Sequence, residues 1–186
     1  MSTRLNLGCG NNRLGGFINV DKSPLCAPDL VLDIDGPLHG PWPWEPNSID
    51  EIVAHHILEH IQCFEWVTKS IYRVLKVGGT VDIRVPHPRS DTFLGDPTHV
   101  RPIMPGTLQM CSRKANAKYR AEGWPNTPLA EQWDVDLELR SISYRLEEKW
   151  RAMVEAKEIS MEEAQAAIGQ FNNVCVEIHM VWEKAS

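Results

Sequence analysis

The feature that most constrains this chain is a glycine turn directly after its first short apolar segment. Residues 4–7 form a short strand pattern, and Gly8-Cys-Gly10 follows at once. Glycine permits backbone conformations closed to other residues and lets a ligand approach the peptide N–H groups closely. We therefore expect Gly8 and Gly10 to lie at the carboxyl end of a first parallel strand, beside a ligand site.

Two aspartates strengthen this expectation. Asp21 follows the apolar residues 17–20, and Asp33 follows the apolar residues 30–32. In open α/β sheets the ligand lies outside the carboxyl ends of the strands, where both carboxylates would fall. A carboxylate that ends the second strand can accept two hydrogen bonds from a ribose diol. The pattern predicts a nucleoside cradle, and the alternative is a plain glycine turn with two solvated aspartates.

The rest of the first half predicts an α/β fold. Further strands are expected over residues 49–54 and 80–85, with a helix over residues 63–75 whose apolar residues recur at helical spacing. Gly78-Gly79 follows that helix, as a helix end and a tight turn require. Strands interleaved with a helix and connectors predict a mostly parallel, doubly wound sheet that is buried on both faces.

The second half predicts two more strands and two helices. Residues 135–146 alternate but slip in phase near Arg140-Ser141, which indicates one strand with a bulge. Ser160 to Glu163 forms a capping-box pattern that opens a helix, and residues 174–182 alternate as a final strand. We expect a single domain over residues 1–186.

Residues 86–133 form a long, proline-rich insertion that is expected to cap the substrate site. The insertion follows the fifth strand, so it starts at the same sheet edge as the glycine turn. His87 and His99 are candidates for removing a proton from a substrate near neutral pH. Arg101 is a candidate for holding a carboxylate or phosphate. Alternatively, Asp96, His99 and Arg101 bond to one another and stiffen the loop.

Charge and cysteine usage narrow the class of partner. The formal net charge is −6, without the basic footprint of a nucleic-acid binder. The five cysteines include no CxxC pair, which argues against a disulfide framework or a zinc ribbon and favours a reducing compartment. Neither a signal peptide nor a membrane span is recognisable. We expect a cytoplasmic protein with a small-molecule substrate, and the oligomeric state stays open.

Five segments in order resemble class I S-adenosylmethionine (SAM)-dependent methyltransferases, and most closely the methyltransferase type 11 group. The resemblance covers about residues 4–88 and implies a Rossmann-like, seven-stranded sheet with an antiparallel last strand. It also implies SAM as cofactor and methyl transfer to an unidentified acceptor. The segments are Leu5-Asn-Leu-Gly-Cys-Gly10, Asp33-Ile-Asp-Gly-Pro-Leu38, Pro43-Trp-Glu-Pro-Asn-Ser-Ile-Asp50, His56-Ile-Leu-Glu-His60 and Tyr72-Arg-Val-Leu-Lys-Val-Gly-Gly79.

The resemblance also implies a set of cofactor-binding residues. The first segment would line the methionine end of SAM, Asp21 would bind the ribose, and Asp33 with Ile34 would meet the adenine. His55 and His56 would lie beneath the cofactor at the end of the fourth strand. The implied residues of the first segment are Asn6, Leu7, Gly8, Cys9 and Gly10.

The first segment departs from the family pattern in three ways. Asn6 stands where an acidic residue is usual, and Asn12 replaces the third glycine of a GxGxG pattern. The stretch between Gly10 and Asp21 is too short for the usual helix plus strand, so a turn or two must replace the helix. The short spacing also argues against a nicotinamide dinucleotide site, where the acidic residue lies about 20 residues on.

Two other functions stay open at this point. His56, Glu59 and His60 match an HxxEH pattern, in which two histidines hold zinc and a glutamate acts as base. The resemblance places a segment without metal there, so we expect no metal site and disfavour a zinc hydrolase. The second alternative is a SAM-binding protein without catalytic activity.

Overall fold

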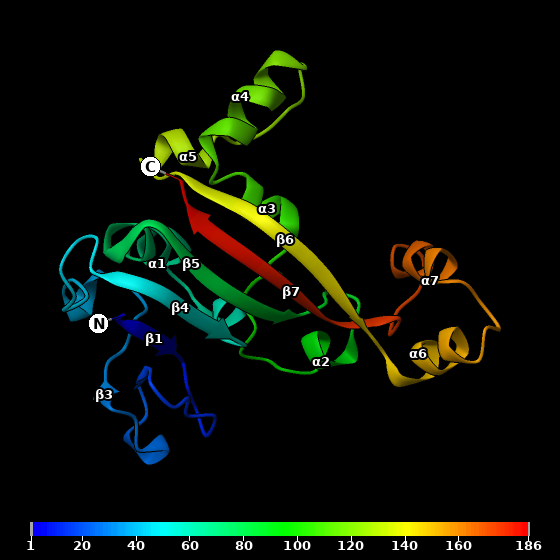
Figure 1. The fold of residues 1–186 in the computed structure, drawn as a ribbon, viewed down its shortest axis with the longest axis horizontal. Helices are drawn as coiled ribbons and strands as arrows, with labels where there is room; N and C mark the ends of the chain where they lie inside the picture. Colours follow the sequence, from blue (N-terminus) through cyan, green and yellow to red (C-terminus); the bar gives the residue numbers. More distant parts are fainter. Residues whose placement is uncertain (1, 186) are drawn as a thin grey trace.

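The computed structural model describes residues 2–185 and contains one seven-stranded sheet with the strand order β3-β2-β1-β4-β5-β7-β6 (Figure 1). Strands β1 to β5 run parallel, while β7 runs antiparallel to both β5 and β6. This order confirms the expected α/β methyltransferase-type sheet. The strands are β1 (Arg4–Leu7), β2 (Ile18–Asp21), β3 (Leu30–Val31), β4 (Ile49–His55), β5 (Leu75–Pro86), β6 (Leu137–Leu146) and β7 (Cys175–Lys184).

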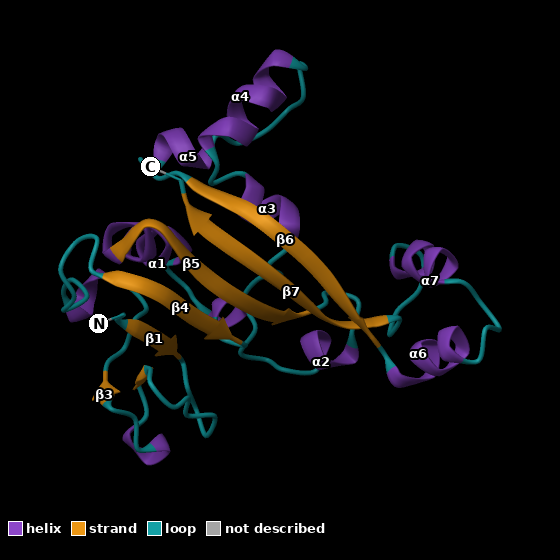
Figure 2. Cartoon of the chain, viewed as in Figure 1, coloured by secondary structure: helices purple, strands orange, loops and turns teal. Residues whose placement is uncertain are grey.

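The helices are distributed unevenly along the chain (Figure 2). A loop connects β1 to β2, and loops with one short 3-10 turn each connect β2 to β3 and β3 to β4, so the described part of the chain has its first α-helix between β4 and β5. Within residues 2–185, no helix is long and apolar enough to cross a membrane. The α-helices are α1 (Phe64–Val74), α2 (Asp91–Leu94), α3 (Pro105–Gln109), α4 (Arg113–Ala121), α5 (Leu129–Gln132), α6 (Glu148–Glu155) and α7 (Met161–Ile168).

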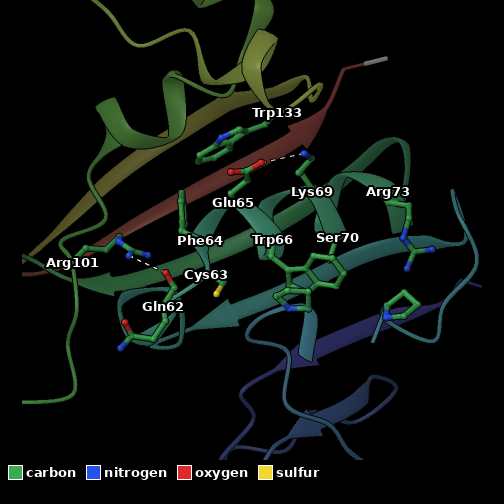
Figure 3. A pocket seen from close by; sticks show the side chains of 12 residues that line it. Gln62, Cys63, Phe64, Glu65, Trp66, Lys69, Ser70, Arg73, Arg101 and Trp133 are labelled. Atoms are coloured by element: carbon green, nitrogen blue, oxygen red, sulfur yellow. Dashed lines mark hydrogen bonds and ion pairs between the residues drawn. The ribbon is translucent and has the colours of Figure 1, made fainter. Parts of the chain in front are cut away.

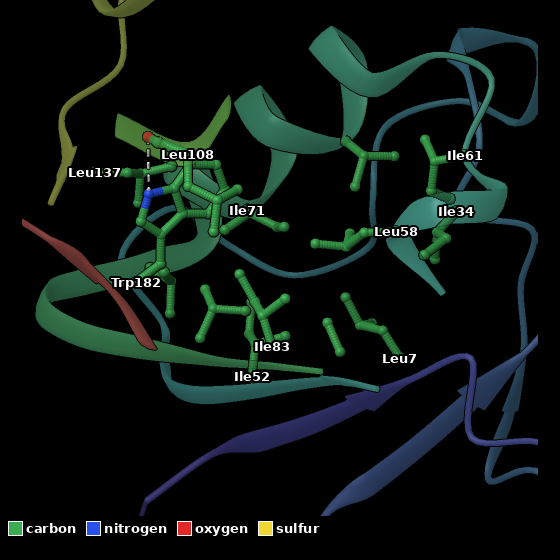
Figure 4. Close-up of a cluster of buried hydrophobic side chains, with 14 of the residues drawn as sticks. Leu7, Ile34, Ile52, Leu58, Ile61, Ile71, Ile83, Leu108, Leu137 and Trp182 are labelled. Carbon is green, nitrogen blue, oxygen red and sulfur yellow. Dashed lines mark hydrogen bonds between the residues drawn. The ribbon is translucent and has the colours of Figure 1, made fainter. Parts of the chain in front are cut away.

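The hydrophobic core lies between the sheet and the layer that contains α1 and α3 (Figure 4). Val67, Ile71 and Val74 of α1 are at most 1% exposed. Burial of each such side chain stabilises the fold by about 1.5–3 kcal/mol. Trp182 of β7 is fully buried in the same layer, and its indole Nε1 donates to the Leu108 carbonyl oxygen of α3 at 3.3 Å. This hydrogen bond avoids the cost of an unpaired polar group in the core.

The opposite face of the sheet is polar and open to solvent, which corrects the expectation that both faces are buried. In β5, the half-buried or exposed Thr80, Asp82 and Arg84 alternate with fully buried Val81 and Ile83. Figure 1 views the sheet from this open side, with α1 behind the strands. The physical reason is the short connections between the first three strands, which leave no room for the helices that would cover this face.

Two further expectations need correction. Gly78-Gly79 do not form a turn after α1, because β5 already begins at Leu75, next to the helix end. The two glycines instead lie inside β5, where the pairing with β4 shifts between Ile49 and Glu51. The insertion over residues 86–133 does not lie as a whole over the predicted site. Its helices α4 and α5 lie near the C-terminal end of β7 and the start of β6, away from the carboxyl ends of β1 and β4 (Figure 1).

Candidate cofactor-binding site

The glycine turn after β1 is anchored by Asp21. Gly8 and Gly10 both have positive φ angles, +62° and +48°, in the region that favours glycine. The Gly10 N–H donates to Asp21 Oδ2 at 2.8 Å, and the Ser23 N–H donates to Asp21 Oδ1 at 2.8 Å. A carboxylate can accept about four hydrogen bonds. Asp21 therefore shapes the turn and keeps acceptor capacity for a ligand.

A cavity of about 650 Å³ lies beside this turn, at the carboxyl ends of β1, β2 and β4. Its size falls in the range of small-molecule sites, about 300–1,000 Å³. Five of the predicted cofactor residues line it: Gly8, Asp21, Asp33, Ile34 and His56. The other lining residues are Lys22, Leu32, Asp35, Ile57, His60, Ile61, Gln62, Pro97, Thr98 and Val100.

The other predicted residues of the segment Leu5–Gly10 stabilise the turn and do not line the cavity. Leu7 and Cys9 are buried at 0% and 4% exposure, and Gly10 contributes its backbone N–H to Asp21. Asn6 is also buried, and its Nδ2 donates to the Asn12 carbonyl oxygen and to Asn19 Oδ1, both at 2.9 Å. Asn6 therefore holds the loop that replaces the usual helix, and it does not line the cavity.

The structure places His55 away from the predicted cofactor position. Successive side chains of a strand point to opposite faces. His55 therefore points to the open face of the sheet, where its Nε2 lies 2.6 Å from Asp82 Oδ1. His179 Nε2 lies 3.0 Å from the other carboxylate oxygen of Asp82. Burial alone would raise the pKa of Asp82, but the hydrogen bonds from both histidines outweigh it and lower the pKa.

Sequence reasoning missed the residues contributed by the segment between β4 and α1. Ile57, Ile61 and Gln62 line the cavity from this segment, which contains the 3-10 turn Leu58–His60. Asp35 fixes its position, because its carboxylate accepts the N–H groups of Gln62 and Cys63 at 2.7 and 2.8 Å. The four-residue spacing of the two isoleucines was a readable signal for one shared surface.

His56 links the cofactor cavity to a smaller one. Its φ angle is +54°, an uncommon and strained value for a non-glycine residue. Its Nε2 lies 2.8 Å from Glu177 Oε2, and its Nδ1 lies 3.6 Å from Glu59 Oε1. The carboxylates of Glu59 and, to a smaller extent, Glu177 raise the pKa of His56, and their effect outweighs that of burial, which lowers it. His56 and His60 also line an adjoining cavity of about 260 Å³, together with Glu59, Asp96 and His99.

The structure does not bring the three predicted catalytic residues together. His87 lines a different cavity, of about 800 Å³, and burial followed by the charge of Arg89 lowers its pKa. Arg101 donates to the carbonyl oxygens of Ile61 and Gln62 at 2.6 and 3.1 Å, so its guanidinium is engaged by the backbone. His99 lines the 260 Å³ cavity, and its Nε2 lies 3.8 Å from Asp96 Oδ2. Of the three, His99 lines the cavity that shares His56 and His60 with the cofactor cavity.

Another cavity, of about 790 Å³, lies on the outer side of α1 (Figure 3). Trp66 and Trp133 contribute to its largely apolar wall, and Arg101 lies at one end. Its one carboxylate, Glu65, pairs with Lys69 at 3.1 Å. This wall has neither the glycine turn nor the aspartates at strand ends, so it does not fit a ribose as the first cavity does.

Comparisons with known proteins agree with the topology. Residues 26–83 match a family model described as a methyltransferase domain. Solved structures that are similar include a SAM-dependent methyltransferase from Archaeoglobus fulgidus, at 17% identity over 98% of this chain and 86% of that chain, with a TM-score of 0.62. A methyltransferase from Mesorhizobium loti described as S-adenosylmethionine-dependent has 14% identity over 98% and 90%, with a TM-score of 0.53.

A third similar structure carries a different name. It is the [4+2]-cyclase SpnF, at 15% identity over 98% of this chain and 75% of that chain, with a TM-score of 0.56. No curated protein matches the chain. At these identities the solved structures support the fold, and the matched segment supports the family.

Proposed function

We propose that the chain is a class I SAM-dependent methyltransferase and that it transfers a methyl group from SAM to a small-molecule acceptor. The observation that carries the proposal is the glycine turn whose Gly10 N–H is bound to Asp21, beside a cavity of about 650 Å³.

The residues present fit the cofactor of this family. Asp21 stands at the end of β2 with acceptor capacity for a ribose diol. Ile34, Ile57 and Ile61 provide apolar surface for a planar base. A Cβ added at Gly10 would meet nothing within 4 Å, so the turn leaves open space beside its peptide groups. SAM supplies an electrophilic methyl group that is already activated by the positive sulfonium.

The protein's main task in such a reaction is to position the acceptor. Alignment of two reactants can supply about 7–11 kcal/mol of the barrier reduction, so a dedicated base is not required. Pro97, Thr98 and Val100 of the insertion line the cavity and cover it from one side. These residues are proposed to exclude water and to orient the acceptor, whereas His87 lines a different cavity.

A second candidate is a SAM-binding protein that does not transfer methyl groups. The similarity to a structure named as a [4+2]-cyclase favours keeping it, because one fold can host unrelated chemistries. Bound SAM without turnover on any acceptor offered would support this alternative.

The proposal is tested by calorimetry with SAM and S-adenosylhomocysteine. We expect the native chain to bind both, and Asp21→Ala to lose about 1.5–3 kcal/mol, as for hydrogen bonds to a charged group. Asp50→Ala is the matched control, because Asp50 pairs with Lys76 near the start of β4, away from the cavity. Equal affinity of the native chain and Asp21→Ala would contradict the ribose-binding role.

A further inference from the structure

Glu59, His60 and His99 converge in the 260 Å³ cavity that adjoins the cofactor cavity. One ligand atom from each of the three side chains lies within 4.8 Å of the others. Glu59 and His60 come from the 3-10 turn after β4, and His99 comes from the loop after α2. The grouping therefore depends on the fold and joins segments that are far apart in the sequence.

The buried carboxylate of Glu59 points to a missing partner. Glu59 is 1% exposed, and within residues 2–185 neither of its side-chain oxygens has a hydrogen-bond partner. Its nearest ion-pair atom, His56 Nδ1, lies at 3.6 Å, which is too long for a hydrogen bond. A carboxylate buried without hydrogen bonds costs several kcal/mol, so such a group is retained where a cation satisfies it.

The hydrogen bonds of both histidines leave Nε2 available for a metal. Thr98 Oγ1 donates to Asp96 Oδ1 at 2.6 Å, so its contact with His60 Nδ1 at 2.9 Å requires His60 to donate from Nδ1. His99 Nδ1 lies 2.8 Å from the Phe93 carbonyl oxygen, which can only accept. Metal-binding histidines are held in this way, with the second ring nitrogen donating to a carbonyl or to another oxygen acceptor.

We propose that Glu59, His60 and His99 form a binding site for a divalent transition-metal ion of the Zn²⁺ type. One carboxylate oxygen and two Nε2 atoms are the ligand set of many catalytic zinc sites, which keep a further position open. The positive ion would compensate the buried charge of Glu59. This ligand set differs from the one that the HxxEH pattern suggests, because His56 Nε2 is engaged by Glu177 and His99 takes its place.

The position of the site suggests what its open coordination position would bind. His60 lines both the 260 Å³ cavity and the cofactor cavity, so an ion there would face the place where an acceptor meets the cofactor. This part of the inference rests on the proposed function. It favours acceptors that carry a hydroxyl or carboxylate oxygen, since the open position of a catalytic zinc site takes water or a substrate oxygen.

The test is a calorimetric titration of Zn²⁺ into the full chain after removal of metals with a chelator. The native chain is expected to bind one ion per chain and to show a higher unfolding temperature with Zn²⁺. Glu59→Gln and His99→Ala should each weaken binding more than 100-fold, and Thr98→Val about 10- to 100-fold, as for residues that orient a ligand. His55→Ala is the matched control, and its Zn²⁺ affinity should equal that of the native chain.

Three results would overturn the metal site. They are a native chain that does not bind Zn²⁺ stoichiometrically, unchanged Zn²⁺ affinity in His99→Ala, and loss of binding in His56→Ala with binding retained in His99→Ala. Circular dichroism of the metal-free variants reports their folding independently of any ligand. If the native chain binds Zn²⁺ but neither SAM nor S-adenosylhomocysteine, the proposed function fails while the metal site stands.

Discussion

An alanine at Gly8 should be much more damaging than an alanine at Gly10, although both glycines belong to the same turn. A Cβ built at Gly8 would lie 2.7 Å from Cδ1 and Cγ1 of Ile57 and 2.9 Å from its Cβ. A Cβ built at Gly10 would meet nothing within 4 Å. Both positions have positive φ angles, so both variants share the same backbone strain.

The difference between the two variants isolates the contact with Ile57. Positive φ destabilises a non-glycine residue by about 1–2 kcal/mol. Alanine also lowers the conformational entropy of the unfolded chain, which offsets about 0.4–1 kcal/mol of that cost. Both terms cancel in the comparison. Overpacking adds about 1–3 kcal/mol at Gly8 alone. Gly8→Ala should therefore unfold about 1–3 kcal/mol more easily than Gly10→Ala.

Urea unfolding followed by circular dichroism measures this difference. At a slope of about 1–3 kcal/mol per molar, the midpoint of Gly8→Ala should lie about 1 M below that of Gly10→Ala. S-adenosylhomocysteine affinity should also fall more in Gly8→Ala, because Ile57 lines the cofactor cavity and must move. In an Ile57→Ala background the cost of Gly8→Ala should shrink, since two of the three close atoms are gone. Equal midpoints for the two glycine variants would refute the reasoning.

Three other variants and probes test parts of the structure outside the cavity. Asn6→Asp should destabilise the fold by about 3 kcal/mol in chemical unfolding, because its carboxylate would face two oxygen acceptors in a buried place; an unchanged midpoint would contradict this. Since burial lowers the pKa of His87 below its usual value of 6.5, the unfolded chain takes up protons first as the pH falls. The native chain should therefore lose unfolding free energy relative to His87→Asn between about pH 7 and pH 5, and parallel profiles would argue against the shift. Burial raises the pKa of Cys111 to about 12 and of Cys175 to about 11, so in the folded protein at pH 8 iodoacetamide should label exposed Cys63 and spare both, as read by mass spectrometry.

Local patterns in the sequence predicted the local elements well. The helix expected over residues 63–75 is α1, because its apolar positions face one core. The capping box at Ser160 and Glu163 is present, with both hydrogen bonds formed. The bulge expected near Arg140 appears as a shift in the pairing of β6 with β7 between Leu139 and Ser141. Each of these features depends on neighbours within a few residues of the chain.

The misplaced site residues depend on distant neighbours or on the phase of a strand. His55 and His56 are adjacent in sequence, yet only His56 lines the cavity, because the pleat of β4 turns His55 to the other face. The sequence pattern grouped Glu59 with His56, whereas the fold brings His99 to Glu59 from a loop. A family resemblance that covers only the first half of the chain contains no signal for that loop.

Because one face of the sheet is open, β5 and β7 each contain buried residues that face the core and more exposed residues that face away from it. The inward positions of β5 and β7 support the packing of the molecule, whereas outward ones such as Thr80, Arg84 and Val181 are half-buried or exposed. Thr80, Arg84 and Val181 could therefore be replaced together without disturbing the interior. Their regular spacing along the strands makes these positions suitable for grafting a new recognition surface.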